Sequence, residues 1–399
     1  MSTQPVFANL ARPGRPPRSA RRLLRLLERL PLGELEVRLP GGAVQRCGHG
    51  MATSTGQHGV LQLHDWAMFD RALRSGDIGF AESFIDGEWD SPDLTQLLRL
   101  CIRNREHIEG VIYGSWWGRL GYRLRHLLRR NSKAGSARNI HAHYDLGNDF
   151  YRLWLDPTKT YSSAIFEKSD EPLEQAQRRK LQAILDRTAT NSGDRILEIG
   201  CGWGSFARLA SEQERAVHGL TLSTEQKAHV DALDLSDVTV SLTDYRDVAG
   251  TYDAIASIEM VEAVGQEYWP AYFDTIARVL RPGGRAALQF ISIADDVFPA
   301  YAEGVDFIQR YVFPGGMLLS QSRFRALAEE RGLEWRDQVS FGQDYAETLR
   351  RWREAFDAAD LPARYDARFR RLWRYYLQYC EGGFRGGGID VHQVTLVKR

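Results

Sequence analysis

The sequence of 399 residues predicts an α/β protein, with a mostly parallel β-sheet covered by helices and a small α+β domain before it. Two observations carry this prediction. After residue 139, short apolar β-like runs alternate with helical stretches, which is typical of a parallel sheet with both faces covered. A glycine-rich turn, Gly200–Gly204, also joins one of these runs to a helical segment. At about 100–200 residues per domain, the length accommodates two or three domains.

The composition excludes several classes of protein. Apolar residues make up 43% and charged residues 26%, which predicts folded domains rather than wholesale disorder. The 52 basic and 52 acidic residues give a net charge of zero, so we expect no nucleic-acid partner. No apolar run reaches the roughly 18 residues of a membrane span. The four cysteines form no C-x-x-C pair, so we expect no metal site and a reducing compartment.

The N-terminal third predicts a small domain at residues 19–130. Residues 1–18 are proline-rich and predict a disordered tail. A short helix is expected from Ser19, with leucines on one side and arginines on the other. Alternating residues predict strands at 34–39 and 60–64, and a helical pattern follows from 65 to 104.

A second basic segment, residues 116–130, predicts an amphipathic helix. Its leucines share one helical face and its arginines another, as in helices that lie in an anionic lipid interface. The same pattern is typical of a helix that packs on a core and exposes a charged face. Residues 131–138 then predict a linker, and the second domain follows at 139–399.

The second domain is expected to contain a mostly parallel, seven-stranded sheet. Apolar runs predict strands at 195–199, 217–221, 238–242, 254–258, 286–291 and, late in the chain, 391–397. The segments between several of these runs have helical periodicity.

The glycine-rich turn is the sharpest local motif. Its spacing is G-x-G-x-G, at Gly200, Gly202 and Gly204, and Ser205 departs from the dinucleotide pattern G-x-G-x-x-G. Glu198 precedes the first glycine by two residues. A carboxylate there opposes a pyrophosphate but suits an ammonium group, such as that of S-adenosylmethionine. The alternative is a strand–helix turn that binds nothing.

Neighbouring segments support the S-adenosylmethionine interpretation. Asp253 begins the fourth strand, Arg281-Pro-Gly-Gly precedes the fifth, and Asp244-Tyr-Arg follows the third, where an adenine pocket is expected. The second strand ends without an acid for the ribose, so nearby hydroxyl and amide groups must serve instead. The domain thus resembles the Rossmann-like class I methyltransferases. The predicted cofactor-binding residues are Tyr161, Ser162, Glu198, Gly200, Gly202, Trp203, Gly204, Thr221, Ser223, Gln226, Tyr245 and Arg246.

Eight short blocks, in their order and spacing, resemble the cyclopropane-fatty-acyl-phospholipid synthases and their mycolic acid relatives. The resemblance covers residues 139–397. The matching blocks are 143–151 (HYDLGNDFY), 155–157, 161–164 (YSSA), 200–204 (GCGWG), 221–226 (TLSTEQ), 244–247 (DYRD), 311–316 (YVFPGG) and 375–377.

The resemblance implies methyl transfer from S-adenosylmethionine to a cis double bond in a phospholipid acyl chain, followed by ring closure. It implies a bound bicarbonate as the base that removes a proton from the new methyl group. Its site residues fall on Glu262, on the backbone of Ile291 and on Tyr345. The family's cysteine position holds Ser163, and its histidine position holds Gln289.

Two of these substitutions bear on the product. Ser163 still offers a hydroxyl donor, but Gln289 does not titrate as histidine does. Glu259 stands where many members have glycine, and we expect it to be structural or to support the site. The alternative is that Glu259 and Glu262, three residues apart, face one pocket. This combination resembles a branch that includes plant cyclopropane synthase domains. We expect a cyclopropane, with a methyl-branched or methylene chain as the alternative.

The basic amphipathic segments favour an enzyme at the inner face of the cytoplasmic membrane. Its expected partners are a phospholipid with a cis-unsaturated acyl chain and an anionic membrane surface, and the family resemblance also allows a homodimer. Two other functions stay open. One is a small-molecule methyltransferase, and the other is a non-catalytic lipid-binding protein.

Overall fold

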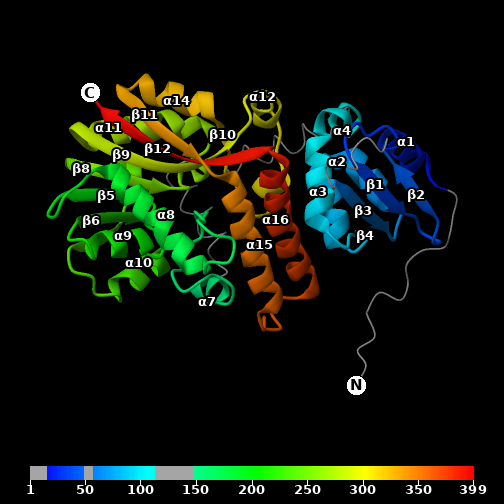
Figure 1. The fold of residues 1–399 in the computed structure, drawn as a ribbon, viewed down its shortest axis with the longest axis horizontal. Helices are drawn as coiled ribbons and strands as arrows, with labels where there is room; N and C mark the ends of the chain where they lie inside the picture. Colours follow the sequence, from blue (N-terminus) through cyan, green and yellow to red (C-terminus); the bar gives the residue numbers. More distant parts are fainter. Residues whose placement is uncertain (1–15, 49–56, 113–146) are drawn as a thin grey trace. The chain divides into compact units, whose positions relative to one another are not determined.

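A computed structural model describes residues 16–48, 57–112 and 147–399. The chain forms two compact units (Figure 1). The first unit combines residues 1–123 with 362–388, and the second combines 124–361 with 389–399. Most of the predicted tail, the amphipathic segment 116–130 and the linker 131–138 lie outside the described residues, so these remain predictions.

The first unit contains a four-stranded sheet in the order β2-β1-β3-β4. Both strands predicted here form, as β1 and β3, and they pair in parallel. The structure adds β2 and the two-residue β4. The elements are α1 (Arg18–Leu27), β1 (Glu34–Arg38), β2 (Val44–Cys47), β3 (His58–Leu63), α2 (Ala67–Ile85), β4 (Trp89–Asp90), α3 (Leu94–Arg103), α4 (Arg105–Ile112) and α16 (Ala367–Gly386).

Helix α16 packs closely on α3, although the predicted boundaries assigned it to the second domain. Glycines allow this close approach. A Cβ atom on Gly382 would lie 3.0 Å from the Cβ of Leu98, and one on Gly386 would lie 2.9 Å from a methyl carbon of Ile102. The first unit is therefore completed by a segment from near the C-terminus.

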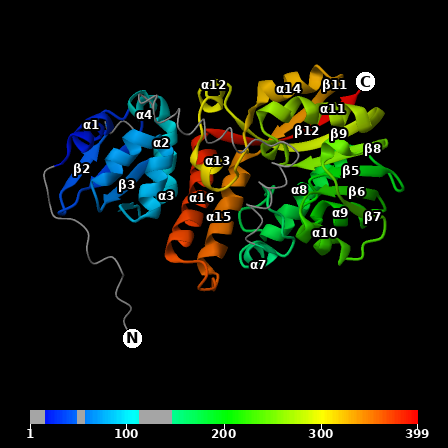
Figure 2. The same cartoon turned by 180° about the vertical axis from the view of Figure 1, so that it is seen from behind.

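The second unit is built on the sheet β11-β12-β9-β8-β5-β6-β7 (Figure 2). The short β10 pairs with β9. Strands β5 to β9 pair in parallel, and β12 runs antiparallel between β9 and β11. The strands are β5 (Arg195–Ile199), β6 (Ala216–Thr221), β7 (Val238–Leu242), β8 (Tyr252–Ile258), β9 (Leu280–Ile293), β10 (Leu319–Ser320), β11 (Leu333–Ser340) and β12 (Ile389–Lys398).

Helices cover both faces of this sheet, as predicted. Apolar residues of α8 and α9 pack with β5, β6 and β8, whereas those of α11 and α14 join a second core with β9 and β12. The helices are α7 (Gly147–Arg152), α8 (Leu173–Thr188), α9 (Ser205–Ser211), α10 (Thr224–Asp231), α11 (Trp269–Val279), α12 (Phe298–Ala302), α13 (Phe307–Tyr311), α14 (Gln321–Glu329) and α15 (Gly342–Ala358).

The six strands predicted for this domain are all present. The sequence did not predict β11, because its charged and polar residues alternate weakly and most remain partly or fully exposed at the sheet edge. Within the described ranges, no helix is both long enough and apolar enough to cross a bilayer.

Candidate active site

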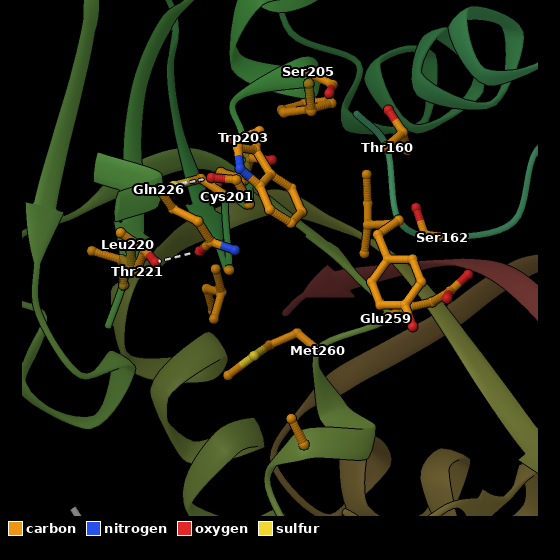
Figure 3. A pocket seen from close by; sticks show the side chains of 18 of the residues that line it. Thr160, Ser162, Cys201, Trp203, Ser205, Leu220, Thr221, Gln226, Glu259 and Met260 are labelled. Atoms are coloured by element: carbon orange, nitrogen blue, oxygen red, sulfur yellow. Dashed lines mark hydrogen bonds between the residues drawn. The ribbon is translucent and has the colours of Figure 1, made fainter. Parts of the chain in front are cut away.

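A cavity of about 180 Å³ lies at the carboxyl ends of β5, β6 and β8, where ligands of open α/β sheets bind (Figure 3). Thr221 and Gln226 lie on one side of it, opposite Ser162 and Glu259. Nine of the twelve predicted cofactor-binding residues line the cavity. They are Tyr161, Ser162, Glu198, Gly200, Gly202, Trp203, Thr221, Gln226 and Tyr245.

The glycine turn borders the cavity through Gly200 and Gly202, and all three of its glycines have a left-handed backbone. The φ angles are +84° at Gly200, +51° at Gly202 and +81° at Gly204. Side chains strain such a backbone. A Cβ atom on Gly204 would also lie 2.9 Å from Val230 of α10. Gly204 does not line the cavity. Its missing side chain allows α9 to begin close to α10.

Glu198 is a buried acid with unused acceptor capacity. It is 3% exposed, it lines the cavity, and its Oε2 has no hydrogen-bond partner among the described residues. Burial raises the pKa of this carboxyl well above its ordinary value, and the nearby Lys180 ammonium partly opposes that rise. An orphaned carboxylate in a cavity fits the ammonium of S-adenosylmethionine.

The polar side chains at the end of β6 and the start of α10 form hydrogen bonds within this segment. The Thr221 hydroxyl donates to the side-chain oxygen of Gln226 over 2.7 Å. Ser223 does not line the cavity. Its hydroxyl oxygen caps α10 by accepting a hydrogen bond from the backbone N–H of Gln226 at 3.2 Å. Thr221 and Gln226 are thus the groups that face the cavity where ribose hydroxyls are expected.

The segment after β7 contributes Tyr245 but not Arg246. The Arg246 guanidinium forms a bidentate pair with Asp244, at 2.8 and 2.6 Å, and does not line the cavity. Arg246 therefore supports the turn, and the buried Tyr245 ring faces the cavity in its place.

The wall opposite β6 comes from the segment after α7 and from α8. Ser162 accepts a hydrogen bond of 2.5 Å from Lys180 Nζ, and Trp203 donates to Asn148 over 2.6 Å. The ring of Tyr161 lies 5.3 Å from that of Trp352, centroid to centroid. These contacts fix the aromatic and hydroxyl groups that border the cofactor space.

Three predicted catalytic residues converge on Glu259. The Tyr345 hydroxyl donates to Oε2 over 2.7 Å. The Gln289 amide donates to Oε1 over 2.7 Å, and the backbone N–H of Ser163 donates to Oε1 over 2.9 Å. Glu259 lines the cavity, whereas its three donors lie behind it. The expected structural or supporting residue thus occupies the centre of the site.

The other two predicted catalytic residues pair with each other. Glu262 Oε1 accepts from the backbone N–H of Ile291 at 2.5 Å, and its Oε2 has no partner among the described residues. Burial, with the neighbouring Glu259, raises the pKa of Glu262 to about 8. The Ser163 hydroxyl instead donates to the backbone oxygen of Ala164 over 2.9 Å.

The arrangement does not fit a bound bicarbonate. Two of the donors expected to hold it, Tyr345 and Gln289, already donate to Glu259. The hydrogen bonds that an external anion would need from these two side chains are therefore already made to the carboxylate of Glu259. The residues around Glu198, by contrast, fit S-adenosylmethionine.

Sequence reasoning missed Lys180. It is fully buried, lines the cavity, and lies close enough to Glu198, Glu259 and Asp156 to interact with all three charges. Burial lowers the pKa of its ammonium to about 8. A signal was present, because Lys180 stands with Ala176 on the buried stripe of an amphipathic helix, where a lysine needs a charged partner.

Comparisons with known proteins agree with this geometry. Residues 131–394 match the family model described as mycolic acid cyclopropane synthetase. Tuberculostearic acid methyltransferase UfaA1 of Mycobacterium tuberculosis is 38% identical over 350 residues, covering 83% of this chain and 81% of that protein. Cyclopropane-fatty-acyl-phospholipid synthase of Escherichia coli is 35% identical over 359 residues, covering 87% and 90%.

Solved structures show the same fold in the second unit. Cyclopropane synthase MmaA2 from Mycobacterium tuberculosis aligns with a TM-score of 0.62 at 33% identity, over 66% of this chain and 98% of that one. Mycolic acid cyclopropane synthase CmaA1, solved with SAH and CTAB, aligns with a TM-score of 0.60 at 32% identity and the same coverage. This protein is an S-adenosylmethionine-dependent methyltransferase and belongs to the mycolic acid cyclopropane synthetase family.

Proposed function

We propose that this enzyme methylates the cis double bond of an unsaturated acyl chain in a membrane phospholipid and closes a cyclopropane ring. The observation that carries the proposal is the orphaned Glu198 carboxylate in a glycine-floored cavity that also reaches Glu259. This places a cation-binding group and a proton-accepting group in one space. The relative from Escherichia coli named cyclopropane-fatty-acyl-phospholipid synthase supports the same reaction.

In this proposal, different residues of the cavity bind the cofactor and stabilise the charge that forms during the reaction. S-adenosylmethionine, when bound, supplies an electrophilic methyl group. Glu198 would hold its ammonium, and Thr221 and Gln226, which line the same cavity, would face its ribose. The carboxylate groups near the methyl stabilise the cation that forms on the acyl chain.

A methyl-branched or methylene chain is the second candidate product. It follows from the same cation when a hydride shift precedes proton loss. The relative named tuberculostearic acid methyltransferase favours it, as does the Ser163 hydroxyl, which donates to Ala164 instead of Glu259. Loss of a proton from the added methyl group then gives the methylene chain, whereas loss of a proton from a neighbouring carbon of the acyl chain gives a methyl-branched alkene.

We place the enzyme at the inner face of the cytoplasmic membrane as a peripheral protein. The support is the exposed basic surface formed by Arg21, Arg22 and Arg25 of α1 and by Arg29 just after it. Such a surface attracts anionic lipid head groups. A homodimer remains compatible with the family resemblance.

The test is expression in a host that makes cis-monounsaturated lipids but lacks its own cyclopropane synthase. Mass spectrometry of total fatty acids should show a chain about 14 mass units heavier, which corresponds to one added CH₂. NMR then separates a cyclopropane from a methylene isomer. Folded protein without any new lipid would instead favour the small-molecule methyltransferase or the non-catalytic lipid-binding protein.

A further inference from the structure

We infer that the Glu259 carboxylate is the resident proton acceptor of the reaction and fills the place where the family resemblance puts a bound bicarbonate. The inference rests on the proposed function, because it concerns the proton lost after methyl transfer to the acyl chain. It rests on four observations: the backbone of Glu259, its donors, its position in the cavity and the charges around it.

The first observation is that the backbone of Glu259 is strained. Its φ angle is +51°, in the left-handed region that glycine adopts freely and glutamate rarely does. A non-glycine residue in this region is retained where the surroundings over-determine it, as at functional sites. Here the surroundings are the hydrogen bonds to its carboxylate, which stabilise the side chain in this position and so offset the strain of the backbone.

Its donors come from three separate segments and leave acceptor capacity open. Oε1 accepts from Gln289 and from the Ser163 backbone, whereas Oε2 accepts from Tyr345. A carboxylate has about four lone-pair positions, so one remains for a proton. The Gln289 amide is oriented because its own oxygen accepts from Gln393 over 3.0 Å.

Glu259 also faces the reacting space. It lines the cavity with Glu198 and the glycine turn, and Figure 3 shows it beside Ser162. Burial raises the pKa of the Glu259 carboxyl above its ordinary value, and the Lys180 ammonium with the three hydrogen bonds partly opposes that rise and favours the ionised form. Lys180 lines the same cavity, where it donates to Ser162. The site thus has its own anion, already held by the groups that an external anion needs.

The proposed step balances without another reagent. A C–H bond of the added methyl group breaks, and its proton forms an O–H bond with the Glu259 carboxylate. The electron pair of that C–H bond forms the third C–C bond of the ring, or the C=C bond of a methylene product. Glu259 becomes neutral and later releases the proton to solvent, so no oxidant or reductant is required.

The test compares wild type, Glu259→Gly and Glu259→Gln with vesicles of an unsaturated phosphatidylglycerol. Formation of S-adenosylhomocysteine and of modified lipid is measured in carbon-dioxide-depleted buffer and in added bicarbonate. We expect the wild-type rate to be independent of bicarbonate. Both variants should lose about 10²–10⁴-fold, the usual contribution of a general base.

Rescue distinguishes the two variants. Glycine fits the left-handed backbone and opens the place of the carboxylate, so bicarbonate or formate should restore Glu259→Gly at least tenfold. The Glu259→Gln amide fills that place, so the same anions should leave it inactive. Calorimetric binding of S-adenosylmethionine should stay within a few-fold of wild type in both, which shows that the cofactor space has survived.

A readout without turnover completes the test. Bicarbonate should raise the melting temperature of Glu259→Gly but not that of wild type. A wild-type rate that depends on bicarbonate, or a Glu259→Gln variant with the wild-type rate, overturns the inference and leaves the proposed function standing. A wild type that modifies no lipid overturns the proposed function, and the melting comparison then tests separately whether Glu259 fills the anion place.

Discussion

At the scale of single residues, Glu198 is a buried acid in the cavity with an oxygen that is free to bind a cation. Replacing it by glutamine keeps the shape of the side chain and removes the charge. We expect Glu198→Gln to weaken S-adenosylmethionine binding by about 1.5–3 kcal/mol, the size of a hydrogen bond to a charged group. Isothermal calorimetry measures this, with exposed Glu174→Gln as the matched control. Unchanged affinity in Glu198→Gln would place the ammonium elsewhere.

Glu262 gives the ligand-free protein a dependence of stability on pH. Its pKa is raised from 4.5 to about 8, chiefly by burial and then by Glu259. Between these two values the folded state binds more protons than the unfolded state, so stability falls as pH rises. We expect the melting temperature to decrease from pH 5 to pH 8, and the Glu262→Gln variant to show a smaller decrease. Equal slopes in the two proteins would contradict this assignment.

At the scale of elements, α8 brings a cation to the acids of the site. Burial raises the pKa of Glu259, and the Lys180 ammonium partly opposes that rise. Lys180→Met keeps much of the side-chain volume and removes the charge, so the pKa of Glu259 should rise. If Glu259 is the proton acceptor, the acid limb of the kcat profile should move to higher pH. Exposed Lys168→Met is the control. A loss of rate without a shift in the profile would indicate a purely structural role for Lys180.

Substitutions in and just after helix α1 test how the protein binds a membrane surface. Its apolar residues Leu23 and Leu24 are buried, whereas its arginines are exposed, so it offers charge rather than an inserting face. Changing Arg21, Arg22, Arg25 and Arg29 to glutamine should weaken binding to anionic vesicles by about 1 kcal/mol for each charge near the surface. Vesicle sedimentation at low and high salt measures the effect. Binding that ignores both the substitutions and the salt would rule out this surface.

At the scale of the whole molecule, the first unit depends on a helix encoded near the C-terminus. A valine at Gly382 would bring its Cβ atom within 3.0 Å of Leu98 and 3.2 Å of the backbone of Arg99. We expect Gly382→Val to destabilise the first unit by about 1–3 kcal/mol, as overpacking does. Urea unfolding measures this. Gly304→Val, whose nearest neighbours lie at 3.7 Å or more, is the control. Equal effects of the two variants would mean that the α3–α16 contact contributes little.

Local sequence was sufficient for the elements of the second unit. The runs at 195–199 and 238–242 form β5 and β7 with the predicted bounds, because a short apolar run between turn residues specifies a strand whether it is central, as β5, or at the sheet edge, as β7. The glycine turn was equally readable, since its positive φ angles require residues without a side chain. Those two features fixed the fold class and the cofactor space.

Tertiary structure decided what local patterns do not encode. Glu259 meets donors that stand 30, 86 and 96 residues away along the chain, and helix α16 meets Thr95 across 286 residues. Periodicity reports which face of an element is buried, but not which side chain from another element reaches it. The sequence by itself therefore determined the class of fold and the cofactor. Only the packing of distant segments showed that the chain supplies a carboxylate where an external anion was expected.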